Sequence, residues 1–298
     1  MSDNDFRNKI HSALQSQRPS LSSSSLRTYT SVLHNLHSKH LNQDHNNMEW
    51  FSQNYKKILD YLNENVRKST RKSVLSALYV LTNRPEYHEQ MIEDAKDINE
   101  EYREQRKTQK QEDNWISVQQ IKDKYDELLT QVQKIFQKRA IGDVSAIMEY
   151  LLVAFLGGIL MPPRRSLDYA LLKWKNYDKN ADNYYSRNKI YFNKYKTSDK
   201  YGLTVIDVPR ELNTVLKKWL KINPSDYVLV STHMNPLSSS QITRMLNKIF
   251  GKQVSVNMLR HIFLTNYYKD IPKLTEMQNV ASKMGHDVST ALEYVKKE

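Results

Sequence analysis

The stretch "KIYFNKYKTSDKYGLTVIDVP", residues 189–209, interrupts the helical pattern that fills most of this chain. Two short runs rich in β-branched and aromatic residues, 189–193 and 203–208, flank a polar segment that contains Asp199 and Gly202. Such runs around a polar turn predict a β-hairpin. Because helical periods stand on both sides of it, we expect a mainly α-helical protein with a small antiparallel β-sheet, an α+β fold.

Helical spacing of apolar residues continues around the hairpin. The longest apolar run, 145–161, contains Glu149 and ends before two prolines, so it predicts a buried helix and not a membrane span. Four further helical periods follow the hairpin, at 211–222, 238–252, 256–269 and 273–284.

The first part of the chain also has helical character. Residues 21–83 contain three or four helical segments, the first of them preceded by serines suited to N-capping. Residues 95–114 are strongly charged and carry no continuous apolar face, which fits a solvated helix, an interdomain linker or both. We expect a helical domain at 1–94, a charged linker at 95–114 and a second domain at 115–298.

Composition favours a polyanionic partner. The 298 residues include 45 Lys and Arg against 33 Asp and Glu, a formal net charge of +12. Such an excess favours nucleic acid, although a basic protein without such a partner is the alternative. The absence of cysteine excludes disulfides, cysteine-ligated metal sites and cysteine catalysis. The first 15 residues lack a long apolar core, so we expect a protein that is not secreted and acts inside the cell, at DNA.

A pair of arginines follows the buried helix in "MPPRRSLDYALLKW". Arg164 and Arg165 stand where the next helix begins, and a helix N-terminus favours an anion, which arginine binds in a bidentate manner. Asp168 lies three residues after Arg165 and is placed to hold it. An ordinary surface arginine paired with Asp168 is the alternative.

A lysine at the turn of the hairpin is the second candidate. Lys196 lies where a side chain can reach a DNA groove, with Lys194 and Lys200 as rivals. Lysines at such turns also serve solubility alone.

The segment "VNMLRHIF" places Arg260 and His261 within an apolar helical pattern. A charge in such a position needs a partner or a ligand, because an unpaired buried charge is costly. A structural ion pair for Arg260 and a hydrogen-bonded structural role for His261 are the alternatives.

The fourth candidate is "KMGHDVSTALEYVKK" near the end of the sequence. Gly285 suits a helix C-cap, and His286 then lies at the joint between two helices, near whatever Tyr294 faces. A core aromatic is the alternative interpretation of Tyr294.

Taken in order, these segments resemble the tyrosine recombinase (phage integrase) family, in the form found in viruses and other mobile elements. "RRSLDYALLKW" resembles the first arginine box and selects Arg165, and "KYKTSDK" is similar to the hairpin lysine box and selects Lys196. "NMLRHIF" resembles the "H-x-L-R-H" box, with Arg260 as its arginine. "MGHDVSTALEY" resembles the "L-G-H … T … Y" box, with His286 and with Tyr294 as nucleophile.

The chain departs from the family pattern at Asn257, which replaces the first histidine of "H-x-L-R-H". Asparagine can donate a hydrogen bond to a phosphate oxygen but cannot shuttle a proton. The resemblance implies that Asn257 and His286 add hydrogen bonds at the phosphate. Asp168 and His261 remain as supporting residues.

The resemblance implies a site-specific recombinase or integrase. Such an enzyme cleaves and rejoins double-stranded DNA through a 3′-phosphotyrosine link, with no metal or other cofactor, as a homotetramer on two DNA sites. It also implies a helical core-binding domain ahead of the catalytic domain. A type IB topoisomerase, a telomere resolvase and a catalytically inactive DNA-binding relative are the alternatives.

The resemblance also assigns roles to the residues. Arg165 and Arg260 would neutralise the non-bridging oxygens as their charge rises in the transition state. Because a tyrosine hydroxyl is protonated at neutral pH, Tyr294 needs a base or a strongly positive pocket, and His286 is the candidate. Lys196 would give a proton to the leaving 5′-oxygen.

Overall fold

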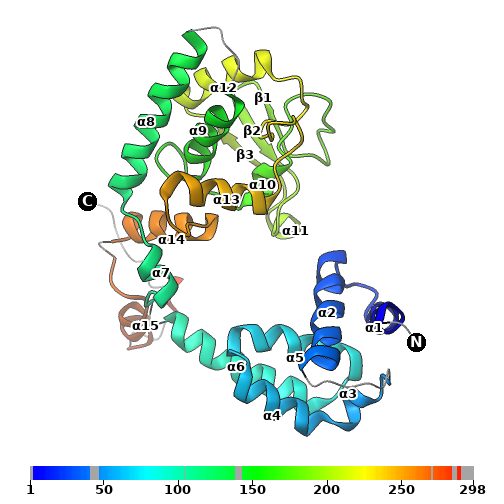
Figure 1. The fold of residues 1–298 in the computed structure, drawn as a ribbon. Coiled ribbons are helices and arrows are strands. Elements are labelled where there is room, and N and C mark those ends of the chain that lie inside the picture. The colour runs from blue at the N-terminus through cyan, green and yellow to red at the C-terminus, as the bar shows by residue number, and fades with distance from the viewer. Residues whose placement is uncertain are drawn as a thin grey trace. The chain divides into compact units, whose positions relative to one another are not determined.

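The computed structural model describes residues 3–40, 47–103, 105–137, 143–269, 271–283 and 287–289. The chain divides into two compact units, Met1–Arg106 with Pro272–Glu298, and Lys107–Ile271. Helices dominate, and the strands within the described ranges form one three-stranded antiparallel sheet, which confirms the predicted fold class (Figure 1). The predicted domain boundaries stay a prediction; the division between units falls inside the charged segment 95–114, and residues 272–298 group with the first unit.

The first unit is helical. Its elements are α1 (Asp3–Gln17), α2 (Ser23–Asn35), the π-helical turn η1 (Leu36–His40), α3 (Trp50–Gln53), α4 (Tyr55–Asn65), α5 (Lys68–Thr82), α6 (Pro85–Arg103) and α15 (Leu274–Lys283). The Ser22 hydroxyl caps α2 by accepting a hydrogen bond of 3.1 Å from Ser25 N, as the serine-rich sequence predicted. Helix α6 extends through the first part of the charged segment.

Helix α1 is a helix that the sequence analysis did not predict. Phe6, Ile10 and Leu14 are fully buried and repeat every four residues, so they form one apolar stripe. Helix α1 uses this stripe to pack against α2 and α5. The spacing was present in the sequence, but the polar residues between these positions obscured it.

A buried ion pair joins α5 to α6. Arg71 Nε donates a hydrogen bond of 2.7 Å to Asp94 Oδ2, and Arg71 Nη2 pairs with Asp94 Oδ1. The two side chains are 6% and 1% exposed. Removing one partner leaves the other charge buried without compensation, so the pair strongly couples these two helices.

We expect Asp94→Ala to destabilise the first unit by about 3 kcal/mol, because Arg71 would keep a buried, unpaired charge. Hydrogen exchange in increasing urea, followed by mass spectrometry, measures the midpoint for peptides of α5. Lys68→Ala is the matched control, since Lys68 and its partner Asp97 are both exposed, where solvent screens an ion pair and leaves it little effect on stability. Equal midpoints for the two variants would contradict this account.

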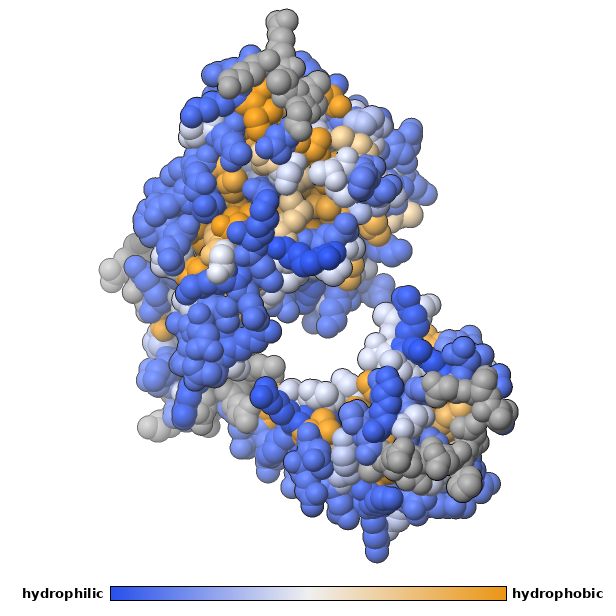
Figure 2. All heavy atoms as spheres, in the orientation of Figure 1, coloured by the Kyte–Doolittle hydropathy of each residue, from blue (hydrophilic) through white to orange (hydrophobic). Residues whose placement is uncertain are grey.

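The second unit combines helices with the sheet. Its elements are α7 (Gln109–Asn114), α8 (Val118–Gln137), α9 (Val144–Leu156), α10 (Ser166–Ala170), β1 (Tyr184–Ser186), β2 (Lys189–Phe192), α11 (Ser198–Tyr201), β3 (Thr204–Asp207), α12 (Arg210–Ile222), α13 (Ser239–Phe250) and α14 (Val256–Tyr267). Figure 2 shows hydrophilic side chains over most of the displayed surface of this unit.

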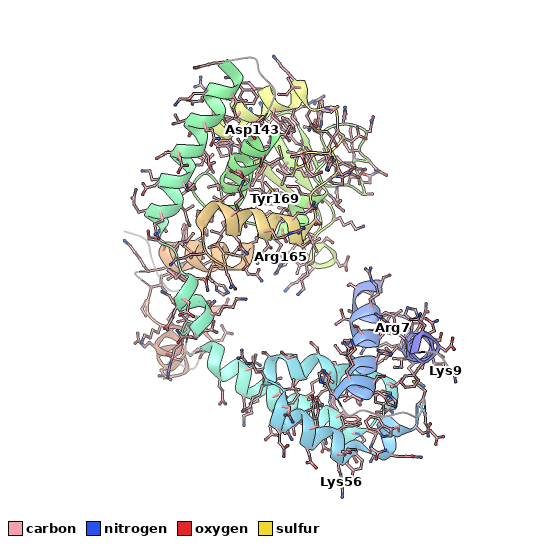
Figure 3. The ribbon with its side chains drawn as sticks, in the orientation of Figure 1. Arg7, Lys9, Lys56, Asp143, Arg165 and Tyr169 are labelled. Carbon is pink, nitrogen blue, oxygen red and sulfur yellow. The ribbon has the colours of Figure 1, made fainter. Side chains whose placement is uncertain are left out.

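Helix α9 is the centre of the second unit, and α8, α12, α13 and α14 all contact it. The Asp143 carboxylate caps its start by accepting a hydrogen bond of 3.0 Å from Ala146 N (Figure 3). The helix is buried as predicted but ends earlier, at Leu156. Gly158 then takes φ +75°, a conformation that favours glycine, and a Cβ there would lie 2.7 Å from Phe263 Cδ2. Among the described helices, none is long and apolar enough to cross a membrane.

The sheet has the order β1–β2–β3 and is antiparallel throughout. Strands β2 and β3 form the predicted hairpin, with Ile190 opposite Ile206, and the turn region contains the short helix α11. Gly202 ends α11 with φ +63°. Strand β1 was not predicted.

A tyrosine pair lies in the core where α8 meets α9. The Tyr125 hydroxyl donates a hydrogen bond of 2.7 Å to Glu211 Oε1 and lies 3.3 Å from the Tyr150 hydroxyl. Burial raises the pKa of Tyr150 to about 12 from its ordinary value of 10.0. The folded state therefore keeps this proton in a pH range where the unfolded chain loses it.

We expect the second unit to lose stability as the pH rises from about 10 to above 12, because the raised pKa means that the unfolded chain ionises first. Over this pH range, the free energy of unfolding should fall by up to about 2 kcal/mol less in Tyr150→Phe than in the wild type. Urea unfolding followed by circular dichroism at pH 8 and pH 12 measures the difference. Tyr201→Phe, at an exposed tyrosine of the same unit, is the control and should follow the wild type.

Candidate active site

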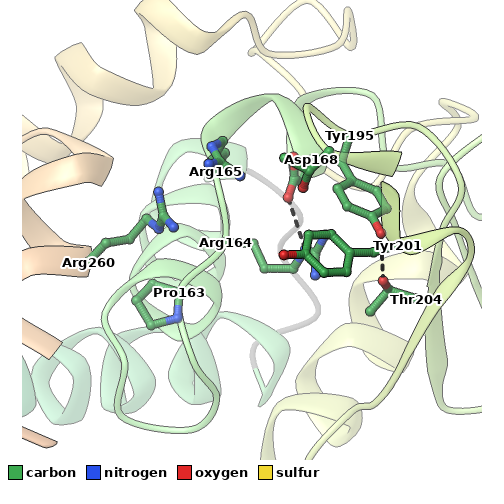
Figure 4. A pocket seen from close by; sticks show the side chains of 9 residues that line it. Pro163, Arg164, Arg165, Asp168, Tyr195, Tyr201, Thr204 and Arg260 are labelled. Atoms are coloured by element: carbon green, nitrogen blue, oxygen red, sulfur yellow. Dashed lines mark hydrogen bonds and ion pairs between the residues drawn. The ribbon is translucent and has the colours of Figure 1, made fainter. Parts of the chain in front are cut away.

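A cavity of about 310 Å³ lies within the second unit, next to the start of α10 (Figure 4). It is formed by the segment before α10 and α10 itself, the loop between β2 and β3 with the start of β3, and one side chain of α14. The lining residues are Pro163, Arg164, Arg165, Asp168, Tyr195, Thr197, Tyr201, Thr204 and Arg260. Two of the predicted site arginines, about 95 positions apart in the sequence, therefore share one cavity.

The scaffold holds Arg165 and Arg260 next to each other. Arg165 occupies the N-cap position of α10 with extended backbone, φ −72° and ψ 153°. Arg260 comes from α14, which is anchored by buried residues such as Leu259 and Ile262. Figure 4 shows the two guanidinium groups side by side.

The electrostatics of the cavity are unbalanced. Burial, and then the nearby Arg165 charge, lower the pKa of Arg260 from its ordinary value. Among the described residues no carboxylate forms an ion pair with either Arg165 or Arg260. The structural ion pair considered for Arg260 is therefore not found in the described part of the chain. Two adjacent cations that no carboxylate pairs with form a site for an anion with at least two oxygens.

Asp168 does not hold Arg165, contrary to our expectation. Its Oδ2 accepts a hydrogen bond of 2.9 Å from Arg164 Nε, while Oδ1 has no hydrogen-bond partner in the described residues. The carboxylate is 2% exposed. Next to it, Tyr169 is fully buried, stacked on Phe155 at 4.9 Å between ring centroids, and fixes α10 to the core (Figure 3).

Lys196 lies in the loop between β2 and β3 and is exposed. It does not line the cavity itself, but its neighbours Tyr195 and Thr197 both do. The rivals Lys194 and Lys200 are exposed as well. Of these three lysines, Lys196 alone has a lining residue on each side.

The other predicted residues of α14 face outward. Asn257 is exposed and lies one turn before Arg260, outside the set of lining residues. His261 is exposed too, so it is not part of the buried side of the helix. The Ser255 hydroxyl caps α14 by accepting a hydrogen bond of 3.2 Å from Met258 N. The predicted residues His286 and Tyr294 lie outside the described residues.

Four polar lining residues were not predicted: Tyr195, Thr197, Tyr201 and Thr204. The only feature of the sequence that could have pointed to these four residues is that they lie near the candidate Lys196 along the chain. In the described ranges, no three His, Asp or Glu side chains are grouped so that they could hold a metal ion.

A family model described as the phage integrase family matches residues 122–298, more than half of the chain. The chain belongs to the phage integrase family. This match confirms the resemblance inferred from the four motifs. A search of curated protein sequences finds no match to this chain.

Solved structures of lambda integrase and of XerA recombinase are also similar to the chain. A lambda integrase (75–356) dimer bound to a COC′ core site has 15% identity, covers 92% of each chain and gives a TM-score of 0.49. XerA recombinase has 16% identity, covers 99% of this chain and 94% of its own, and gives a TM-score of 0.35. A lambda integrase tetramer bound to a Holliday junction has 16% identity to the chain. The match covers 90% of this chain and 73% of the integrase chain, with a TM-score of 0.46.

We expect Arg260→Gln to stabilise the sulfate-free protein by about 0.5 kcal/mol at low salt, because it removes a cation that no carboxylate balances. Added sulfate should raise the melting temperature of the wild type by mass action and have little effect on this variant. Differential scanning fluorimetry across a sulfate series measures both effects. Arg210→Gln, at an exposed arginine outside the cavity, is the control. An Arg260→Gln protein that is less stable and keeps the full sulfate response would contradict an anion site.

Proposed function

We propose that this chain is a site-specific DNA recombinase or integrase that cleaves and rejoins DNA strands through a 3′-phosphotyrosine intermediate, without a metal ion. The observation that carries the proposal is the adjacent pair Arg165 and Arg260, which has no carboxylate partner in the described residues. The two non-bridging oxygens of a phosphodiester fit such a pair. Membership of the phage integrase family and the net charge of +12 support DNA as the substrate.

In the proposed reaction, the Tyr294 hydroxyl loses its proton to His286 and attacks the phosphorus. The new phosphotyrosine bond forms as the bond to the 5′-oxygen breaks, and Lys196 gives that oxygen a proton. Arg165 and Arg260 stabilise the negative charge that grows on the non-bridging oxygens. Attack by a second DNA strand's 5′-hydroxyl then releases Tyr294 and restores a phosphodiester.

Asn257 has a secondary role in this proposal. It lies on α14 one turn before Arg260 and is exposed, so a bound DNA backbone has access to its amide. Its N–H group can donate to a phosphate oxygen, but it moves no proton. Proton transfer therefore falls to His286 and Lys196.

We also propose that the chain acts on double-stranded DNA inside a cell, as a homotetramer on two DNA sites, and that it serves a virus or another mobile element. These points rest on the family membership and on the motif forms, in particular "PPRR".

Covalent capture tests the proposal. The purified protein is mixed with fragments of its source DNA, including nicked suicide substrates that prevent religation, and is then denatured in SDS. We expect DNA linked to the wild type and none linked to Tyr294→Phe, since the phenolic oxygen forms the bond. Arg165→Lys should reduce the rate of capture about 100-fold, because one preorganised donor is displaced. Tyr267→Phe, at an exposed tyrosine of α14, is the matched control and should capture normally.

Other outcomes separate the alternatives. DNA relaxation without strand exchange would indicate a topoisomerase-like or resolvase-like enzyme. Clear binding in a gel shift with no capture on any suicide substrate would indicate a non-catalytic DNA-binding protein.

A further inference from the structure

Arg164 lines the same cavity as Arg165 and Arg260, but its surroundings differ from theirs. Its guanidinium carbon lies 4.2 Å from the ring centroid of Phe192 and 4.7 Å from that of Tyr195. Its Nε donates to Asp168 Oδ2 at 2.9 Å, and the arginine side chain is 19% exposed. One side chain thus contacts the end of β2, α10, and the loop of residues 193–203 between β2 and β3, here called the lysine loop.

The ring that Arg164 contacts is a structural part of the lysine loop. The Tyr195 hydroxyl donates a hydrogen bond of 2.7 Å to Gly202 O and lies 3.1 Å from Thr204 Oγ1 (Figure 4). Tyr195 therefore bridges the two sides of the loop, and Lys196 is the next residue. Whatever fixes the Tyr195 ring also restricts where the Lys196 backbone can lie.

A second connection runs parallel to Arg164. Asn183 Nδ2 donates to Asp168 O at 3.0 Å and to Lys194 O at 2.8 Å, and Asn183 Oδ1 accepts from Lys194 N at 2.8 Å. Asn183 is 4% exposed. The lysine loop is thus tied to α10 twice, once through backbone hydrogen bonds at Lys194 and once through the Arg164 contacts with Tyr195.

We propose that Arg164 is a positioning residue, which holds the lysine loop against α10, the helix whose N-cap is Arg165. In this role Arg164 does not bind the phosphate. Its Nε is committed to Asp168, and its planar group lies against two aromatic rings. The inference rests on the proposed function, in which Lys196 protonates the leaving 5′-oxygen.

The choice of leaving group tests this role. A suicide substrate with sulfur in place of the bridging 5′-oxygen releases a thiolate, which is far more acidic than an alcohol and needs no proton donor. A defect that acts through Lys196 is therefore large on the oxygen substrate and small on the sulfur substrate. A defect in phosphate binding or in folding affects both substrates.

The variant is Arg164→Lys, which keeps a charge for Asp168 but loses the planar group that contacts the two rings. On the target sequence recovered by covalent capture, we expect cleavage of the oxygen substrate to fall about 100-fold. Cleavage of the sulfur substrate should stay within about 3-fold of the wild type. Lys196→Ala should show the same selective rescue by sulfur, and Arg165→Lys should be impaired on both substrates.

Arg164→Met with Asp168→Asn is a second variant, because it removes the arginine without leaving a buried carboxylate unpaired. It should give the same rescue by sulfur. Equal losses on the two substrates, for both Arg164 variants, would overturn the positioning role while leaving the proposed function intact. Failure of sulfur to rescue Lys196→Ala would also overturn it. A wild type that cleaves neither substrate would overturn the proposed function itself.

Discussion

The charge balance around the Asp168 carboxylate is the constraint on which the site depends. Three arginines line one cavity, and Asp168 is the only acidic residue among the described lining residues. Its hydrogen bond goes to Arg164, so neither Arg165 nor Arg260 forms an ion pair with a carboxylate in the described part of the chain. Because the free energy of an unpaired, partly desolvated charge is high, this arrangement of charges favours binding of an anion.

The helical core makes this arrangement persist. Side chains that repel each other separate unless their backbones are fixed, and here each backbone is fixed by apolar packing. The buried Tyr169 ring secures α10 against Phe155, and Leu259 with Ile262 secures α14. The stability of the packed core thus offsets the repulsion between Arg165 and Arg260, which is the usual relation between a preorganised site and its scaffold.

Local sequence patterns predicted part of this structure. The other features could be found only from the three-dimensional structure. The β-branched and aromatic runs in 189–209 were enough to predict the hairpin, and the order of motifs selected two arginines, Arg165 and Arg260, that line one cavity. Strand β1 was missed because its turn to β2 uses Arg187 and Asn188, with φ of 49° and 65°, where glycine is the usual signal.

The prediction that Asp168 pairs with Arg165 was wrong for a geometric reason. Sequence distance suggested Arg165, three residues before Asp168. Arg165 occupies the N-cap with extended backbone, and Arg164, four residues before Asp168, makes the hydrogen bond. Tyr195, Thr197, Tyr201 and Thr204 could not be predicted as lining residues, because their place depends on how the loop returns to the sheet.

The proposed reaction would account for a candidate site that combines helix-anchored arginines with a lysine on a loop. In an in-line displacement at phosphorus, the attacking and leaving oxygens lie on opposite sides, while the non-bridging oxygens lie between them. One rigid helix pair can hold the arginines at the non-bridging oxygens, but a proton donor for the leaving oxygen must approach from another direction. A loop between β2 and β3 can provide that approach only if it is held in place. Asn183 and Arg164 connect this loop to α10. The lysine and the arginines are therefore positioned relative to the same helix.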